Sequence, residues 1–192
     1  MAKRIFDVFF AIAGIAVFGV VILVGFFAAG ISTGQNGMFT QTRIGQYGKK
    51  FTIYKLRSMR DSKGKKQITA TGRFLRKYKI DELPQLYNIL IGTMSFVGPR
   101  PDLPGYYDTL TGTNRDILKL KPGITGPATL KYANEEALLA TVNNPLEYND
   151  IILFPDKVRI NLNYQKHQTL WLDVKLIIYT LIGKKPPQDY LQ

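Results

Sequence analysis

Two adjacent carboxylates, Asp81 and Glu82, are the residues of this sequence best suited to chemistry on a phosphate group. Carboxylates can hold Mg²⁺ against a pyrophosphate, arginine forks match phosphate oxygens, and one carboxylate can attack phosphorus as a nucleophile. The other polar residues that could join them are all cations: Lys55, Arg57, Arg73, Arg76, Arg100 and Lys121. A purely structural alternative stays open, because Asp is also a common N-cap of helices.

The composition limits the remaining chemistry. The chain has 192 residues, with 26 Lys and Arg against 14 Asp and Glu, which gives a formal net charge of +12. It contains no Cys and a single His, His167, which excludes disulfides, Cys-ligated metal centres, a thiolate nucleophile and a multi-histidine metal site. The length suits one domain. Catalysis must therefore depend on carboxylates, Lys and Arg, hydroxyls or a metal held by oxygen ligands.

A helix is predicted to begin at the carboxylate pair. Asp81 is expected to be its N-cap, and Pro84 is tolerated in the first turn. Thr71 is expected to cap a short basic helix that precedes it and runs to Lys77. The predicted helix carries an apolar stripe formed by Leu83, Leu86, Tyr87 and Leu90.

Two short strands are predicted before these helices. They span residues 38–44 and 51–57 and flank a Gly-containing turn at 45–48, which is a hairpin signal. Residues 60–66 are polar and contain a glycine, so they are expected to form a mobile loop. Alternation along the second strand places two apolar and two basic side chains on one face: Phe51, Ile53, Lys55 and Arg57.

The N-terminal segment is apolar enough to enter a membrane. Residues 5–31 contain one charge, Asp7, and a helix of these 27 residues would be roughly 40 Å long, against a hydrocarbon core of about 30 Å. Basic residues flank both ends, so a simple span would carry one basic flank across the membrane. The charge pattern therefore predicts a re-entrant helix that enters and returns to the cytoplasmic face.

A second apolar helix is predicted near the C-terminus. Thr169 is expected to cap it, and Gly183 closes it. At about 20 Å this helix is too short to span a bilayer. It could lie in the interface plane or face a protein core, and the pattern fits both alternatives. One face is shared by Leu170, Val174, Ile177, Ile178 and Leu181.

Five motifs in order resemble those of the small monotopic phosphoglycosyl transferases, the bacterial sugar transferases that start membrane glycan assembly. The likeness runs from about residue 3 to residue 183. The motifs are KRIFD at 3–7, FTIYKLRSM at 51–59, DELPQLYN at 81–88, MSFVGPRP at 94–101 and KPGITG at 121–126.

This resemblance implies transfer of a sugar-1-phosphate from a UDP-sugar to a polyprenyl (undecaprenyl) phosphate, with Mg²⁺ and release of UMP. Asp81 corresponds to the nucleophile that forms a covalent phosphosugar intermediate, and Glu82 to the residue that assists the metal or the acceptor phosphate. Both would be catalytic residues and metal ligands. Lys55, Arg76 and Arg100 correspond to cations that bind phosphate in the family. Arg57 matches a motif residue to which the resemblance gives no defined role.

The chain departs from the family pattern at two places. Gly19 stands where many relatives break the membrane helix with a proline. After Gly126 many relatives continue with a Trp-Ala-Gln stretch leading to an Arg, and here any phosphate or sugar contact would either fall to Lys131 or be absent. The absence of a long multi-span region before these motifs indicates a minimal catalytic unit.

The expected fold is α+β and mainly α, with a re-entrant membrane helix, a small β-hairpin and amphipathic interfacial helices around a compact catalytic domain. Residues 1–33 would anchor the chain, and 34–192 would form the catalytic domain with its C-terminal interfacial helix. The expected place is the cytoplasmic face of the bacterial inner membrane. Expected partners are the UDP-sugar, polyprenyl phosphate, the bilayer and later glycosyltransferases of the pathway, and no nucleic acid.

Two other functions compete with this interpretation. A non-enzymatic membrane-anchored basic module could bind anionic lipid or nucleic acid, and it would explain the +12 charge but leave the Asp81–Glu82 pair unused. A phosphatidyl-type transferase using a cytidine nucleotide would need more apolar segments and a spaced cluster of aspartates for two metals.

Overall fold

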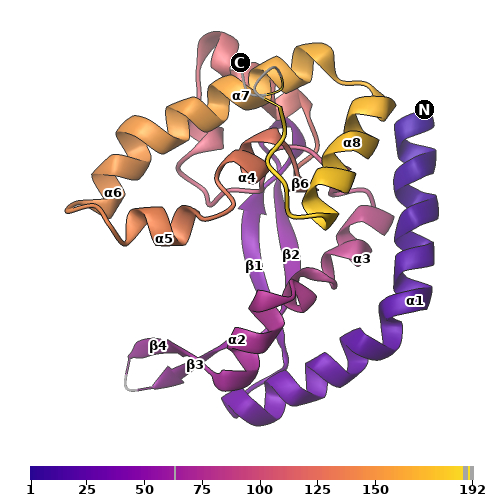
Figure 1. The fold of residues 1–192 in the computed structure, drawn as a ribbon, viewed down its shortest axis with the longest axis vertical. Coiled ribbons are helices and arrows are strands. Elements are labelled where there is room, and N and C mark those ends of the chain that lie inside the picture. The colour runs from indigo at the N-terminus through magenta and orange to yellow at the C-terminus, as the bar shows by residue number, and fades with distance from the viewer. Residues whose placement is uncertain (63, 188–189, 191–192) are drawn as a thin grey trace. The chain divides into compact units, whose positions relative to one another are not determined.

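The computed structural model describes residues 1–62, 64–187 and 190, and the chain forms two compact units. Unit 1 contains Met1–Arg43 and Lys50–Met94, and unit 2 contains Ile44–Lys49 and Ser95–Gln192. The structure is mainly helical with small two-stranded sheets (Figure 1), which confirms the predicted α+β class.

Unit 1 combines one long helix with two small sheets and short helices. β1 pairs with β2, and β3 pairs with β4 in an antiparallel hairpin. The elements are α1 (Ala2–Thr33), β1 (Met38–Ile44, whose last residue belongs to unit 2), β2 (Lys50–Leu56), β3 (Met59–Ser62), β4 (Lys65–Ile68), α2 (Ala70–Lys77), the 3₁₀ turn η2 (Ile80–Glu82) and α3 (Gln85–Leu90).

The strand predictions were right for β1 and within one residue for β2, but the predicted loop at 60–66 was wrong. Met59 pairs with Ile68 and Ser62 with Lys65, so most of that segment is a hairpin. Gly64 has a φ of 77° in the intervening turn, as the tight turns of hairpins require. Thr69, and not Thr71, caps α2, since its side chain accepts a hydrogen bond from Gly72 N.

Helix α1 is continuous over 32 residues and bends along its length in Figure 1. Its most apolar window has a mean hydropathy of 2.8, so by length and composition it could cross a membrane. Ala11 near its start and Ala29 near its end are buried, whereas Val17 and Val20 between them are 69% and 72% exposed. The apolar middle of α1 is thus left for another apolar environment, such as lipid.

Unit 2 is built from short 3₁₀ turns and helices around two apolar clusters. β5 and β6 pair in parallel, with Ser95 opposite Gly123. The elements are η1 (Gln46–Gly48), β5 (Ser95–Val97), η3 (Tyr107–Thr109), η4 (Gly112–Lys119), β6 (Gly123–Thr125), α4 (Pro127–Lys131), α5 (Glu135–Leu139), α6 (Pro145–Tyr148), the π-helical turn η5 (Asn149–Leu153), α7 (Phe154–His167) and α8 (Leu170–Leu181).

Helix α8 is the predicted C-terminal helix, and Thr169 caps it by accepting a hydrogen bond from Leu172 N. Leu176 is fully buried in a cluster of unit 2. Trp171 and Leu181 are 66% and 80% exposed. The helix therefore has both a core face and an exposed apolar face, and the second is the one that an interfacial position would use.

Candidate active site

Asp81 and Glu82 lie in the turn η2 and are buried, with 7% and 8% of their surface exposed. Lys79 precedes the turn in a left-handed conformation, with φ 58° and ψ 19°. Residues other than glycine adopt this conformation rarely and at a cost. Hydrogen bonds of 3.2 Å from Glu82 N to Lys79 O and from Leu83 N to Ile80 O close the turn. The carboxylates are thus held by a strained local backbone.

The structure corrects the expected N-cap role of Asp81. Helix α3 begins at Gln85, its N-cap position is Pro84, and no side chain caps it. The Oδ1 atom of Asp81 is buried and has no hydrogen-bond partner among the described residues. A buried polar atom without a partner costs about 1–3 kcal/mol. Such atoms in native structures call for an explanation, and a catalytic role is one.

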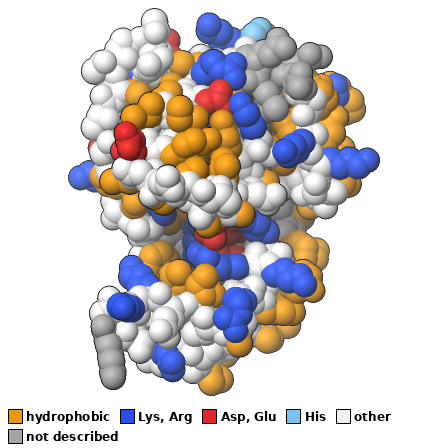
Figure 2. Space-filling model, turned by 60° about the vertical axis from the view of Figure 1, so that its left-hand side comes forward, with side chains coloured by type: hydrophobic (Ala, Val, Ile, Leu, Met, Phe, Trp, Pro, Cys, Tyr) orange, Lys and Arg blue, Asp and Glu red, His pale blue; other side chains and the backbone are white. Residues whose placement is uncertain are grey.

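Both negatively and positively charged side chains influence Asp81. Burial raises the pKa of the Asp81 carboxyl and the neighbouring Glu82 raises it further, while Lys55, Arg76 and Lys79 lower it, and the net direction is upward. A raised pKa makes the carboxylate a stronger base and nucleophile once it is ionised. The same three cations would attract a phosphate ligand. Lysine and arginine side chains are also widespread on the face shown in Figure 2.

Lys79 was not singled out from the sequence. It matters for the site because it lies one turn before Glu82 and has a left-handed backbone conformation. No pattern in the sequence predicts that conformation. The predicted cations Lys55 and Arg76 do lie close enough to Asp81 to influence its pKa.

Lys55 on β2 forms an ion pair with Glu82, with 3.0 Å between Nζ and Oε1. Asn88 of α3 fixes the strand that carries this lysine. Its side chain accepts from Tyr54 N at 3.1 Å and donates to Thr52 O at 2.7 Å. Asn88 is fully buried, and it sets the register between β2 and the helix after the carboxylates. Asn88 belongs to the motif at 81–88, but the sequence indicated no role for it. These two hydrogen bonds indicate a structural role.

Arg76 is positioned by helix α2, which packs closely on the chain before it. A Cβ atom at Gly72 would lie 1.9 Å from Ser58 O, so no other residue fits there without a backbone shift. Leu75 is buried in a cluster with Leu56 and Ala29. The helix that carries Arg76 is therefore attached to both β2 and α1.

Arg4 of the first motif attaches the start of α1 to the far end of α3. Its guanidinium donates to Ile89 O at 2.6 Å and to Leu90 O at 2.7 Å. These carbonyls lie in the last turn of α3, where a cation also interacts favourably with the helix dipole. The basic start of the chain thus stabilises the helix that follows the carboxylates.

Arg57 contacts backbone in unit 1. Its Nε donates to Asn36 O at 2.6 Å and its Nη2 to Met38 O at 3.3 Å, and its guanidinium lies 5.7 Å from the centre of the Phe39 ring. These contacts secure the connection between α1 and β1. The predicted substrate contact of Arg57 remains a prediction.

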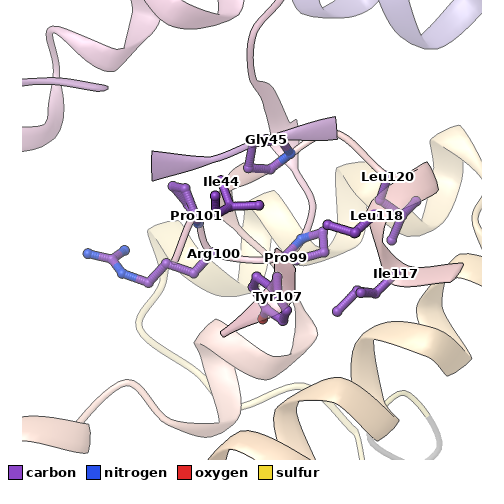
Figure 3. Close-up of a pocket in the computed structure, with 10 residues that line it drawn as sticks. Ile44, Gly45, Pro99, Arg100, Pro101, Tyr107, Ile117, Leu118 and Leu120 are labelled. Atoms are coloured by element: carbon purple, nitrogen blue, oxygen red, sulfur yellow. The ribbon is translucent and has the colours of Figure 1, made fainter. Parts of the chain in front are cut away.

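Arg100 belongs to unit 2 and is exposed. Its side chain extends away from the other residues that line a small pocket, which include Ile44 and Tyr107 (Figure 3). The cavity there has a volume of about 10 Å³, which is the space of one water. This pocket is too small for a sugar nucleotide, and the predicted substrate contact of Arg100 remains a prediction.

Lys131, also in unit 2, is part of an ion cluster around Asp156. Lys131 Nζ and Tyr132 Oη each lie 2.6 Å from Asp156 Oδ2, and Arg159 Nη2 lies 2.7 Å from Oδ1. Burial raises the pKa of Asp156, but the hydrogen bonds from these three residues outweigh burial and lower it to about 2. Lys131 therefore ties α4 to α7, and its predicted substrate role remains a prediction.

A magnesium ion could use the carboxylate pair. No group of three or more His, Asp or Glu ligands occurs within the described part of the chain. Mg²⁺ is commonly held by one or two carboxylates together with substrate phosphates and water. Asp81, with its unpartnered buried oxygen, and Glu82 next to it fit this mode of binding.

Comparison of the sequence with known proteins identifies a family. Residues 1–184 match the family described as Bacterial sugar transferase. The chain is 36% identical over 187 residues to the uncharacterized sugar transferase EpsL of Bacillus subtilis, covering 93% of this chain and 85% of EpsL. It is 30% identical over 194 residues to the UDP-glucose:undecaprenyl-phosphate glucose-1-phosphate transferase of Caulobacter vibrioides, covering 94% and 68%.

Other relatives are longer. The galactosyl transferase CpsE of Streptococcus agalactiae is 34% identical over 203 residues, which cover 94% of this chain and 41% of CpsE. The chain thus spans less than half the length of that relative. Because the family match covers nearly the whole sequence, the chain belongs to the bacterial sugar transferase family and is homologous to undecaprenyl-phosphate sugar-1-phosphate transferases over most of its length.

Proposed function

We propose that this protein transfers a sugar-1-phosphate from a UDP-sugar to undecaprenyl phosphate through a covalent intermediate on Asp81. The observation that carries the proposal is the buried, unpartnered Oδ1 of Asp81, whose pKa is also influenced by three cations. The names of relatives support the substrate class: those from Escherichia coli and Caulobacter vibrioides are UDP-glucose:undecaprenyl-phosphate glucose-1-phosphate transferases.

The reaction has two displacements at one phosphorus. Asp81 Oδ1 attacks the phosphorus that carries the sugar, the Oδ1–P bond forms, and the bond from that phosphorus to the bridging oxygen breaks, so UMP leaves. A phosphate oxygen of undecaprenyl phosphate then attacks the same phosphorus and releases the Asp81 carboxylate. The product is an undecaprenyl diphosphate sugar, and the kinetics are ping-pong.

The side chains around Asp81 prepare the first displacement. Lys55, Arg76 and Lys79 offset the repulsion between an anionic nucleophile and an anionic diphosphate. Glu82 holds Lys55 at 3.0 Å and raises the pKa of Asp81. The raised pKa keeps the Asp81 carboxylate basic, and the cation that Glu82 holds compensates its negative charge.

We include Mg²⁺ in this proposal, held by Asp81 and Glu82. When bound there it would neutralise charge on the diphosphate.

The bilayer is the natural location for an acceptor with a polyprenyl tail. The exposed apolar middle of α1 and the exposed apolar face of α8 support attachment of both units to a membrane. We propose the cytoplasmic face of the bacterial inner membrane, with residues 1–33 as a re-entrant anchor and 34–192 as the catalytic domain. Later glycosyltransferases of the same pathway would be the protein partners.

The test is release of UMP by the purified full chain in detergent or nanodiscs. The panel contains UDP-glucose, UDP-galactose and UDP-N-acetylgalactosamine, each with and without undecaprenyl phosphate and Mg²⁺. We expect release with at least one sugar, and sustained turnover only with the lipid acceptor. If none of a wider set of UDP-sugars gives UMP, the enzyme assignment fails, and a basic lipid-binding module becomes the better account of the +12 charge.

A further inference from the structure

Gln85, the first residue of α3, is another buried polar side chain that carries an atom without a hydrogen-bond partner among the described residues. It is 2% exposed, and its Nε2 atom is buried without a hydrogen-bond partner among the described residues. A buried amide donor left in this state destabilises a protein unless something else satisfies it.

The backbone places Gln85 one turn beyond Asp81. Hydrogen bonds from Leu83 N to Ile80 O and from Leu86 N to Leu83 O, at 3.2 and 3.0 Å, continue the winding of η2 into α3 without a break. Four residues of such a winding advance the chain by only about 6–8 Å. Both side chains are buried, and each carries an atom with no hydrogen-bond partner among the described residues, so one phosphoryl group between them could meet the acceptor of Asp81 and the donor of Gln85.

A phosphoryl group would satisfy both atoms at once. Its phosphorus would meet Asp81 Oδ1, and one of its non-bridging oxygens would accept from an N–H placed beside that carboxylate. Donors aimed at the position where charge develops in a transition state are a common source of rate acceleration.

We propose that Gln85 Nε2 donates a hydrogen bond to a non-bridging oxygen of the sugar phosphate as its phosphorus bonds to Asp81. The proposal rests on the proposed function and adds a catalytic residue to it. In this step the Asp81 Oδ1–P bond forms and the bond from phosphorus to the UMP oxygen breaks. The amide stays neutral and keeps its protons throughout.

Asn88 provides the contrast within the same helix. It is also a fully buried amide, but its side chain accepts from Tyr54 N and donates to Thr52 O and Thr93 Oγ1. An amide with this set of partners is structural, and its loss should lower stability. Gln85 is expected to show the opposite behaviour, with a loss of rate and no loss of stability.

The experiment compares Gln85→Met with wild type and with Asn88→Leu as a structural control. The full chain is mixed with the UDP-sugar that gives UMP, radiolabelled in the sugar, without lipid acceptor, and the rate of covalent labelling of Asp81 is followed. Gln85→Met should label on the order of 10²–10³-fold more slowly, with KM within a few-fold and an unchanged or higher Tm. Gln85→Asn keeps a shortened donor and should label at an intermediate rate.

The pH profile separates a catalytic donor from a packing residue. Because the amide does not titrate, Gln85→Met should lower the labelling rate equally at every pH and leave the acid limb of Asp81 in place. A labelling rate within threefold of wild type overturns the role of Gln85 while the proposed function stands. A slow rate accompanied by a Tm loss like that of Asn88→Leu, or by a shifted acid limb, also overturns it. Absence of labelling in the wild type removes the proposed function, and this proposal with it.

Discussion

Replacing Asp81 by Asn should abolish transfer while leaving the protein at least as stable as the wild type. The substitution keeps the shape of the side chain and removes its charge. Asp81 is not a helix cap, so no capping contact is lost, and its Oδ1 has no partner among the described residues to lose. Only the reaction should depend on the missing oxyanion.

The direction of the stability effect follows from the raised pKa of Asp81, which burial and Glu82 cause. A carboxyl whose pKa is higher in the folded than in the unfolded protein stabilises the fold at low pH, and that contribution is lost as the pH rises through the folded pKa. Above the folded pKa the ionised carboxylate therefore opposes folding, and Asn imitates the neutral form. Relief of part of the cost of burying that charge, about 1 kcal/mol, would raise the Tm by about 2–4 °C in a chain of this size.

The assay measures both quantities on the same preparation. Thermal unfolding gives the Tm, UMP release gives the rate, and mass spectrometry of peptides locates the phosphosugar. Turnover should fall on the order of 10⁴-fold or more, as it does when a nucleophile is removed. Asp116→Asn is the matched control, because this carboxylate is exposed and pairs with Lys119 three residues on, so both its Tm and its rate should stay near wild type. A lower Tm for Asp81→Asn, substantial turnover, or phosphosugar on Glu82 would refute the reasoning.

Three further results are expected. The acid limb of UMP release should lie above the pH at which an ordinary Asp ionises, and Lys55→Met should move it higher still, because Lys55 lowers the pKa of Asp81; an unmoved limb would show that another group controls it. Excess chelator should stop turnover, and added Mg²⁺ should restore it. Cysteines introduced at Lys3 and at Ser62 in this Cys-free chain should both resist an impermeant thiol reagent in intact cells, whereas labelling of one alone would establish a spanning helix.

Local sequence signals predicted the elements whose cause is local. The strands β1 and β2 follow from alternation and from the glycines between them, and the cap of α8 follows from Thr169. The hairpin of β3 and β4 was missed because its residues are polar and carry little strand preference. Its pairing depends on a tight turn with Gly64 at positive φ, which a polar glycine-containing segment does not distinguish from a loop.

For the candidate site too, the sequence predicted the residue types but not the local backbone conformation. Residue types and motif order were enough to single out Asp81 and Glu82, and the structure brings Lys55 and Arg76 to them. Their roles remain predictions. The N-cap prediction for Asp81 was wrong because it required a helix to start there, whereas the left-handed backbone of Lys79 produces a 3₁₀ turn first. A positive φ at lysine has no signature in a single sequence.

The unfavourable free energy of the Asp81 turn has to be offset by stabilising contacts, and these come from distant motifs. A left-handed Lys79 and a buried unpartnered Asp81 each cost on the order of 1–3 kcal/mol, and such costs persist only when the surrounding structure fixes the segment. Arg4 bonds the carbonyls at the end of α3 from 85 and 86 residues away, and Asn88, within α3, bonds the helix to β2. Gly72 lets α2 approach the backbone of Ser58. Local preference would favour an ordinary capped helix at the Asp81 segment, so we expect these three contacts to hold the turn in which Asp81 Oδ1 has no partner among the described residues.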